Sequence, residues 1–285
     1  NSDTMKRFIF IISILIMISA CEAPLDYSRI DSKECIFVET LIGNTPAAVI
    51  TAEVVIPMHS EDYDKCKRDV SVYGTIGGRP IKFIDQENYQ YSQGGMFTHE
   101  IHPGEKIEIT AWAEGIDKVH AETTVPEEIR LKSCRMISRD EDFITFEIVY
   151  EEDPEDEGFY GIKFKDIRIS EAPGIILSES YDMVISGSLL GDILIWDRHR
   201  ARKEGNTVTF RTSVDVRSGG KDSYEVTLYR LSPETFHYLR GLYIKTTNFP
   251  STGMGTPAFT YSNIIGGTGI AGSFWATDTI MKLEK

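Results

Sequence analysis

Apolar and polar residues alternate along much of the chain beyond residue 34. Three such runs lie in its first half, over residues 70–73, 107–114 and 119–125. Successive side chains of a strand point to opposite sides, so a period of two is typical of a strand with one buried face. Turn-forming pairs such as Gly94-Gly95 and Pro103-Gly104 separate the runs. We therefore predict a β-sandwich domain over residues 34–126, of an immunoglobulin-like or carboxypeptidase-regulatory-like kind.

The second half of the chain continues this pattern. Its alternating runs cover residues 144–150, 160–164 and 208–217. The phase of the second run slips near Lys165-Asp166, which predicts a β-bulge there. A turn-forming segment, Ser218-Gly219-Gly220-Lys221, joins the third run to residues 223–231, so these two strands are expected to pair as a hairpin. The runs predict a second β-rich domain over residues 127–285.

One segment of this second domain has a helical signature. Ser232 is a suitable N-cap, Pro233 suits the first helical position, and Glu234 places an acid in the first turn. Phe236 and Leu239 then follow at helical spacing. Another strand is the alternative, but the proline and this spacing argue against it. The predicted fold class is all-β, with one short helix.

The first 20 residues have the pattern of an export signal. Lys6-Arg7 precedes an apolar run over residues 8–18, which is shorter than the roughly 20 residues that a membrane-spanning helix needs. A cysteine directly after Ile18-Ser19-Ala20 indicates a lipoprotein cleavage box. We predict a signal peptide over residues 1–20, acylation of Cys21 and a polar tether over residues 21–33. A plain secretory peptide is the alternative, and both place the protein outside the cytoplasm.

The net charge of −14 narrows the choice of partners. An acidic chain repels the phosphates of nucleic acids, so no nucleic acid partner is expected. An anionic membrane surface would repel it as well, so we expect the acylated Cys21 to hold the protein on the membrane.

Three cysteines follow Cys21, at positions 35, 66 and 134. The cell envelope is oxidising, so these cysteines can form one disulfide, which leaves one thiol over. We predict it between Cys35 and Cys66, because both fall in the first sandwich while Cys134 begins the second region. Three buried free thiols are an equally acceptable alternative.

A glycine-rich segment over residues 266–272 contains the spacing Gly267-x-Gly269-x-x-Gly272, which is that of a dinucleotide-binding turn. Such a turn must lead from a strand into a helix, whose N-terminus binds the phosphates. Residues 273–279 read instead as a strand. We therefore predict that the glycines form a bend between two strands, over residues 260–265 and 273–280, and that the protein binds no cofactor there.

Motifs for metal binding or catalysis are incomplete. His99-Glu100-Ile101-His102 is one residue shorter than the zinc motif, and the two imidazoles of a strand at this spacing would point to opposite faces. The acidic run over residues 151–158 resembles the opening of a calcium loop, but Phe164 stands where the bidentate acid belongs. A weak calcium site of other geometry is the alternative to a solvated hairpin loop. We predict no metal site and no catalytic residues, hence no enzyme.

Several aromatic residues are candidates for stacking on sugars or for contacting a partner, although most aromatic residues of β-proteins lie in the core. They are Tyr27, Tyr89, Tyr91, Trp112, Tyr160, Trp196 and Trp275.

Several segments resemble the family catalogued as domain of unknown function 4249. The similarity rests on residues 231–238 and 259–272, on the hairpin Gly94-Gly95-Met96-Phe97 with the strand after it, and on residues 153–160. It covers most of the chain beyond Cys21. The resemblance implies an outer-membrane lipoprotein of Gram-negative bacteria, in families that often occur beside TonB-dependent receptors. It implies no catalytic residues.

The expected function is binding, as an accessory subunit of a TonB-dependent receptor or uptake system. One alternative is a surface hydrolase that acts on glycan or peptide, with two carboxylates roughly 5–9.5 Å apart in a cleft. A structural or adhesive envelope protein is a third class. A carboxylate pair in a cleft would favour the hydrolase, whereas a flat aromatic surface would favour binding.

Overall fold

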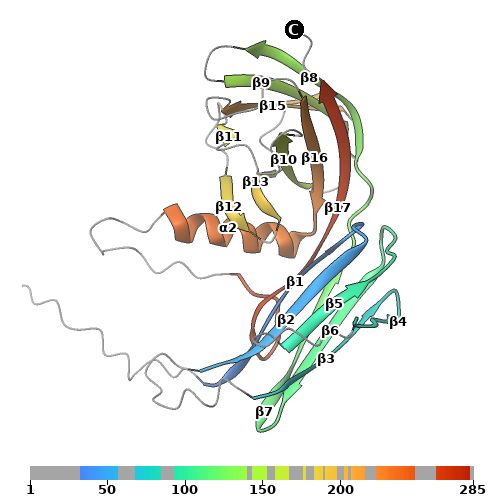
Figure 1. Ribbon diagram of the computed structural model, residues 1–285, viewed down its shortest axis with the longest axis vertical. Coiled ribbons are helices and arrows are strands. Elements are labelled where there is room, and N and C mark those ends of the chain that lie inside the picture. The colour runs from blue at the N-terminus through green and yellow to red at the C-terminus, as the bar shows by residue number, and fades with distance from the viewer. Residues whose placement is uncertain are drawn as a thin grey trace, which may run out of the picture.

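A computed structural model describes most of the chain beyond residue 32. The described residues are 33–56, 68–84, 93–139, 143–152, 158–166, 176–177, 183–188, 190–197, 202–204, 207–215, 223–247 and 261–282. They form two β-rich lobes, one above the other in Figure 1, with one helix between them. The predicted all-β class with one short helix is confirmed.

The lower lobe contains the first seven strands. These are β1 (Cys35–Gly43), β2 (Ala47–Val55), β3 (Val70–Ile76), β4 (Arg79–Pro80), β5 (Gln93–Thr98), β6 (Lys106–Ala113) and β7 (Ile116–Thr124). The alternating runs of the sequence predict β3, β6 and β7 correctly. Their apolar residues face a common core with those of β1 and β2, as expected for a sandwich.

The remaining elements form the upper lobe, the helix and the strand that joins the two lobes. They are β8 (Arg130–Arg139), β9 (Phe143–Glu151), β10 (Phe159–Asp166), β11 (Ile176–Leu177), β12 (Met183–Ser188), β13 (Gly191–Asp197), β14 (Arg202–Glu204), β15 (Thr207–Asp215), β16 (Ser223–Leu231), α2 (Pro233–Thr247) and β17 (Thr268–Lys282). A second core lies between β8, β9 and β15 on one side and β10, β13 and β16 on the other.

One eight-stranded sheet runs through both lobes, in the order β12-β13-β10-β16-β17-β1-β2-β5. Two smaller sheets cover one face of it. The four-stranded sheet β4-β3-β6-β7 packs on its lower part, and the sheet β11-β15-β9-β8 packs on its upper part. The helix α2 packs on the opposite face, against β12, β17 and neighbouring strands. The large sheet is therefore the middle layer of the molecule.

The last strand, β17, joins the two lobes. It lies parallel to β1 from Thr268 to Phe274 and antiparallel to β16 from Phe274 to Lys282. The domain division predicted at residue 126 falls between β7 and β8. The chain nevertheless returns across this division, because β17 is hydrogen-bonded to a strand of each lobe.

The helix α2 begins as the sequence predicts. The Ser232 hydroxyl accepts a hydrogen bond from the Thr235 amide at 3.3 Å, which satisfies an otherwise unpaired N–H of the first turn. Phe236 and Leu239 are almost fully buried and pack on Ile270 of β17. Burial of this apolar stripe holds the helix on the large sheet.

Buried hydroxyl groups connect β7, the start of α2 and β17. The Thr123 hydroxyl lies 3.2 Å from those of Ser232 and Ser273, and the Thr235 hydroxyl donates to the Ser273 carbonyl at 3.0 Å. The Ser273 hydroxyl in turn donates to the Thr124 carbonyl at 2.7 Å. Each of these hydroxyls therefore has partners, which offsets the cost of burying it at the junction of the lobes.

The predicted hairpin of β15 and β16 is wrong. β15 pairs with β9, from Thr207 opposite Glu151 to Asp215 opposite Phe143, whereas β16 pairs with β10 and β17. The two strands lie in different sheets and face each other across one core, to which Val208 and Val226 both contribute. An alternating strand with one buried face fits either arrangement, so the pattern alone does not distinguish a hairpin from a crossing between sheets.

Two further local predictions are wrong. No bulge occurs at Lys165-Asp166, since β10 keeps an unbroken register with β16 from Phe159 to Asp166. Residues 261–264 do not form the expected strand, and Ile265 makes only an isolated bridge to His120. The Asn263 side chain takes the place of backbone pairing, because its amide accepts from the Ala271 N–H at 3.0 Å and donates to the Ala271 carbonyl at 2.8 Å.

The glycine-rich segment leads into a strand, as predicted. The bend lies at Gly266-Gly267, and β17 begins at Thr268, so Gly269 and Gly272 are part of the strand. Positive φ is confirmed at Gly266 (82°) and Gly269 (110°). A Cβ at Gly269 would overlap the carbonyl oxygen of Val38 on β1. This glycine therefore serves the close approach of two backbones.

We predict that Gly269→Ala lowers the free energy of unfolding by about 3 kcal/mol or more, because the new Cβ meets both an unfavourable φ and the backbone of β1. Gly78→Ala is the matched control. Gly78 also has a positive φ (76°), but its Cβ would meet no atom within 4 Å, so a loss of only about 1–2 kcal/mol is expected. Equal losses for the two variants in denaturant unfolding would contradict this account.

The predicted disulfide between Cys35 and Cys66 remains a prediction, because Cys66 lies outside the described residues. The two described cysteines, Cys35 and Cys134, are not linked to each other, and burial raises the pKa of the Cys134 thiol to about 12. We expect mass spectrometry of the oxidised protein under non-reducing conditions to find Cys134 free and the other two linked. The closed loop would then contribute about 3 kcal/mol to stability. Three free thiols in that measurement would refute the pairing.

Candidate functional site

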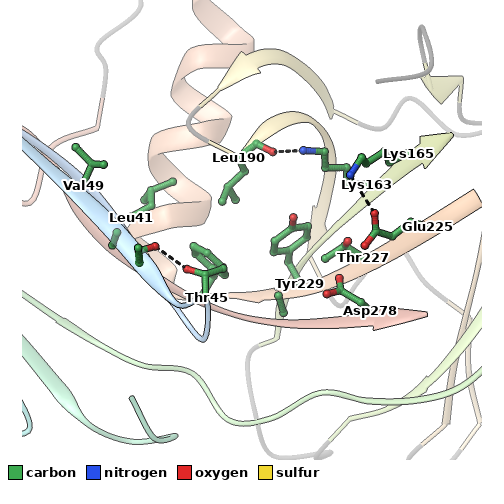
Figure 2. Close-up of a pocket in the computed structure, with 14 residues that line it drawn as sticks. Leu41, Thr45, Val49, Lys163, Lys165, Leu190, Glu225, Thr227, Tyr229 and Asp278 are labelled. Atoms are coloured by element: carbon green, nitrogen blue, oxygen red, sulfur yellow. Dashed lines mark hydrogen bonds and ion pairs between the residues drawn. The ribbon is translucent and has the colours of Figure 1, made fainter. Parts of the chain in front are cut away.

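An open pocket lies on the α2 face of the large sheet, beside the helix (Figure 2). Its volume is about 550 Å³, and its walls come from β1, β2, β10, β16 and β17. Pockets of this size commonly bind small organic ligands. Strands β1 and β2, on one side of β17, contribute mainly apolar side chains, and β10 and β16, on the other side, contribute mainly polar ones. The pocket therefore has an apolar half and a polar half.

The apolar half is formed by the lower strands and by the middle of β17. Leu41 of β1 and Val49 of β2 form one wall (Figure 2), and Phe274 and Ala276 of β17 also line this half. The Phe274 ring lies over Gly43, where any Cβ would overlap it. Val49 is 51% exposed, which is high for a large apolar side chain in a strand. Filling this half would remove apolar surface from water.

The polar half follows the strand register. Lys163, Thr227 and Asp278 stand side by side across β10, β16 and β17. Lys165 and Glu225 occupy the next row and form an ion pair of 3.4 Å. Charges of both signs therefore line this side of the pocket at positions set by the hydrogen-bonded ladder.

Lys163 differs from Lys165 in its partners. Its half-buried ammonium donates one hydrogen bond, of 3.2 Å, to the backbone carbonyl of Leu190. Among the residues that the structure describes, no carboxylate forms an ion pair with it, whereas Glu225 pairs with Lys165. An ammonium carries three N–H donors, so Lys163 retains capacity to bind an anionic group.

Tyr229 lies between the two halves, with its ring in the centre of Figure 2. Burial raises the pKa of Tyr229 to about 12, and the nearby Asp278 and Glu225 act in the same direction. The phenol is consequently neutral at physiological pH and is able to donate a hydrogen bond.

A second candidate surface lies on the outer face of the four-stranded sheet. Tyr73 and Trp112 are 50% and 42% exposed and stand at diagonal positions on β3 and β6, since Tyr73 is opposite Thr110 and Ser71 is opposite Trp112. The Lys118 ammonium lies 5.7 Å from the centre of the Trp112 ring. Of the aromatic candidates from the sequence that the structure describes, only Trp112 has a large exposed fraction.

Three possible metal ligands gather on the same face. The ligand atoms of Glu108, His120 and Glu122 lie within 4.8 Å of one another. The Lys106 ammonium already contacts both carboxylates, at 3.1 Å from Glu108 and 2.9 Å from Glu122. The pKa of Glu122 is lowered by its hydrogen bond with His120 and then by Lys106. The Lys106 ammonium thus lies between the two carboxylates, where a metal ion would have to bind.

The other residues singled out by sequence are distributed as follows. The His99 ring donates through Nε2 to the Gly43 carbonyl at 2.7 Å, so it caps the end of β1. Tyr160 and Trp196 are buried in the upper core. Cys21, Cys66, three tyrosines (27, 89 and 91) and the acidic residues 153–157 lie outside the described residues, so the lipid anchor and the calcium alternative remain predictions.

The sequence did not reveal the pocket. Its residues belong to ordinary alternating strands, and the polar face of residues 223–231 is what any half-exposed strand would show. The one signal in this segment is that Tyr229 and Leu231 follow the polar residues Ser223, Glu225 and Thr227 on that face. Which part of the face the helix leaves open depends on packing.

Among the described residues, no helix is both long and apolar enough to cross a membrane. No curated protein matches the sequence.

Two solved structures align with much of this chain, but with low structural similarity. Bovine butyrophilin aligns with 69% of this chain and 92% of its own, at 10% identity and a TM-score of 0.20. The β-glucuronidase of Parabacteroides merdae aligns with 70% of this chain and 24% of its own, at 10% identity and a TM-score of 0.19.

The family comparison covers nearly all of the described structure. The matched region, residues 30–280, contains both lobes, the helix and most of β17. The chain belongs to the family described as Domain of unknown function (DUF4249).

Proposed function

We propose that this protein is a lipid-anchored component of the outer membrane that binds a small ligand in the pocket beside α2, as an accessory subunit of a TonB-dependent receptor or uptake system. The observation that carries the proposal is the pocket itself, with its apolar wall and a few polar groups at fixed positions. This combination is typical of sites that bind and orient a ligand. The cleavage box before Cys21 supports the location.

The outer face of the four-stranded sheet supports an accessory role. Half-exposed aromatic side chains such as Tyr73 and Trp112 are enriched at the centres of protein interfaces. They lie on the opposite side of the sandwich from the pocket wall formed by β1 and β2. A protein bound there would leave the pocket accessible to its ligand.

The predicted anchor is tested with Cys21→Ser. Loss of the acylated cysteine removes several acyl chains, each of which contributes about 0.8 kcal/mol per buried CH₂, so the variant is expected to leave the membrane fraction. The measurement is cell fractionation with immunoblotting, with Cys134→Ser as the control that keeps the anchor. Retention of the Cys21 variant in the membrane fraction would refute the lipoprotein assignment.

The accessory role is tested by co-purification from detergent-solubilised membranes. The intact protein is expected to recover a β-barrel receptor, and a double variant of Tyr73→Ala and Trp112→Ser is expected to lose it while keeping its melting temperature. Recovery of no receptor with the intact protein would contradict the accessory role and leave the anchor unaffected.

A surface hydrolase is the second candidate, because two carboxylates line the pocket. Glu225 and Asp278 are diagonal neighbours on β16 and β17, a position that separates Cβ atoms by about 7–8 Å or less. Side chains that extend from Cβ atoms at this separation are able to bring their carboxyl groups to the roughly 5–9.5 Å of glycosidases. Neither group is buried in apolar surroundings, as a proton-donating acid usually is, and Glu225 is paired with Lys165. Binding is therefore the function that we favour.

An activity assay separates the two functions. Incubation with a panel of p-nitrophenyl glycosides and aminoacyl p-nitroanilides is expected to give no turnover above that of the Asp278→Asn variant. A rate that falls at least 100-fold in this variant would show that the pocket is a hydrolase site.

A further inference from the structure

We propose that the pocket binds an amphiphilic small molecule with a single anionic group, which pairs with Lys163 while the apolar body of the ligand lies against Leu41, Val49 and Phe274. This inference rests on the proposed function, in that it names the class of ligand for the same pocket. It follows from the distribution of charge and apolar surface around the walls.

Lys163 is the cation that is available to a ligand. Its ammonium is half-buried and its single described partner is a neutral carbonyl, that of Leu190. Charged groups held away from bulk water normally have a partner of opposite charge. The carboxylate, sulfonate or phosphate of a ligand would supply this partner with a charge-assisted hydrogen bond.

Lys165 is less suited to this role. It is paired with Glu225 at 3.4 Å, and its side chain is 49% exposed. An anion approaching Lys165 would have to compete with the carboxylate already there. The two lysines stand two residues apart on β10 and carry the same charge. The charge of Lys165 is neutralised by Glu225, whereas Lys163 contacts a neutral carbonyl.

The neighbouring carboxylates limit where an anion fits. Asp278 stands two strands away from Lys163 in the same row, which places their backbones about 10 Å apart. A second anionic group on the β17 side of the pocket would face Asp278 and be repelled. Thr227 stands between the two in this row, and the neutral phenol of Tyr229, in the next row on β16, offers a hydrogen-bond donor to an anion without adding charge.

The rest of the pocket suits an apolar body. From the polar row, the strand register continues to the pair Tyr229 and Ala276, then to Phe274, and then to Leu41 of β1 and Val49 of β2. A ligand with its anion at Lys163 would extend in this direction along the floor. The apolar contacts would provide affinity and the lysine would fix the orientation.

Two fluorescent probes of similar shape test the inference. 8-Anilinonaphthalene-1-sulfonate is anionic, N-phenyl-1-naphthylamine is its neutral counterpart, and both fluoresce on entering apolar sites. We expect the wild-type protein to bind the sulfonate more tightly. Lys163→Met should weaken binding of the sulfonate at least tenfold and change the affinity for the neutral probe by less than twofold. Retained binding of the neutral probe shows that the variant is folded.

Two control variants test whether the charge effect is specific to Lys163 and whether the probes bind in the pocket. Lys165→Met removes an equal charge from the same strand and should change the affinity for the sulfonate by less than threefold, since that lysine is already paired. Val49→Trp should fill the apolar half and weaken both probes. All titrations are made at one ionic strength, because screening alters the contribution of charges.

Each outcome has one meaning. If the neutral probe binds but Lys163→Met leaves the affinity for the sulfonate unchanged, the proposed ligand class is wrong and the pocket remains a binding site. If Val49→Trp leaves both probes unaffected, they bind elsewhere and the inference fails. If neither probe binds the wild-type protein, both the ligand class and the proposed binding function are overturned.

Discussion

The rest of the structure depends on the insertion of β17 between β1 and β16. A strand inside a sheet must match two ladders at once, and β17 matches a parallel ladder over its first half and an antiparallel ladder over its second half. Without it, β1 and β16 would each present an unpaired edge. The strand also carries residues into two of the three cores, including Ala271 in the lower one and Phe274 in the one under α2.

This insertion imposes local requirements on the sequence. Gly269 is needed where β17 lies against the backbone of Val38. Gly272 is needed where α2 and β1 pack against the strand. A Cβ at Gly272 would lie 2.7 Å from Leu41 and overlap the Thr235 hydroxyl. The Asn44 amide continues the pairing past the end of β1, since it accepts from the Ala276 N–H at 2.7 Å and donates to its carbonyl at 2.8 Å. Small and polar residues therefore hold the junction where large apolar ones would not fit.

The pocket is a consequence of the same arrangement. The helix has 15 residues, so it is about 22 Å long and covers only part of the face of a sheet that extends through both lobes. The uncovered part begins near Phe274, where β17 changes from its parallel to its antiparallel partner. At this point the apolar side chains of the lower strands meet the charged side chains of β10 and β16. A mixed lining arises because strands from two lobes share one surface.

The sequence by itself determined the local elements of the protein. Period-two runs located β3, β6, β7 and β9, and Ser232 with Pro233 located the start of α2, because these signals depend on neighbours along the chain. The strand expected after the glycine-rich segment is also present, because that signal is local as well. The tertiary structure alone decided that β15 and β16 belong to different sheets, that β17 joins β1, and that Lys163 lies in a pocket. Alternation records only that one face of a strand is buried, and the partner that buries it is chosen by packing between residues far apart in the chain.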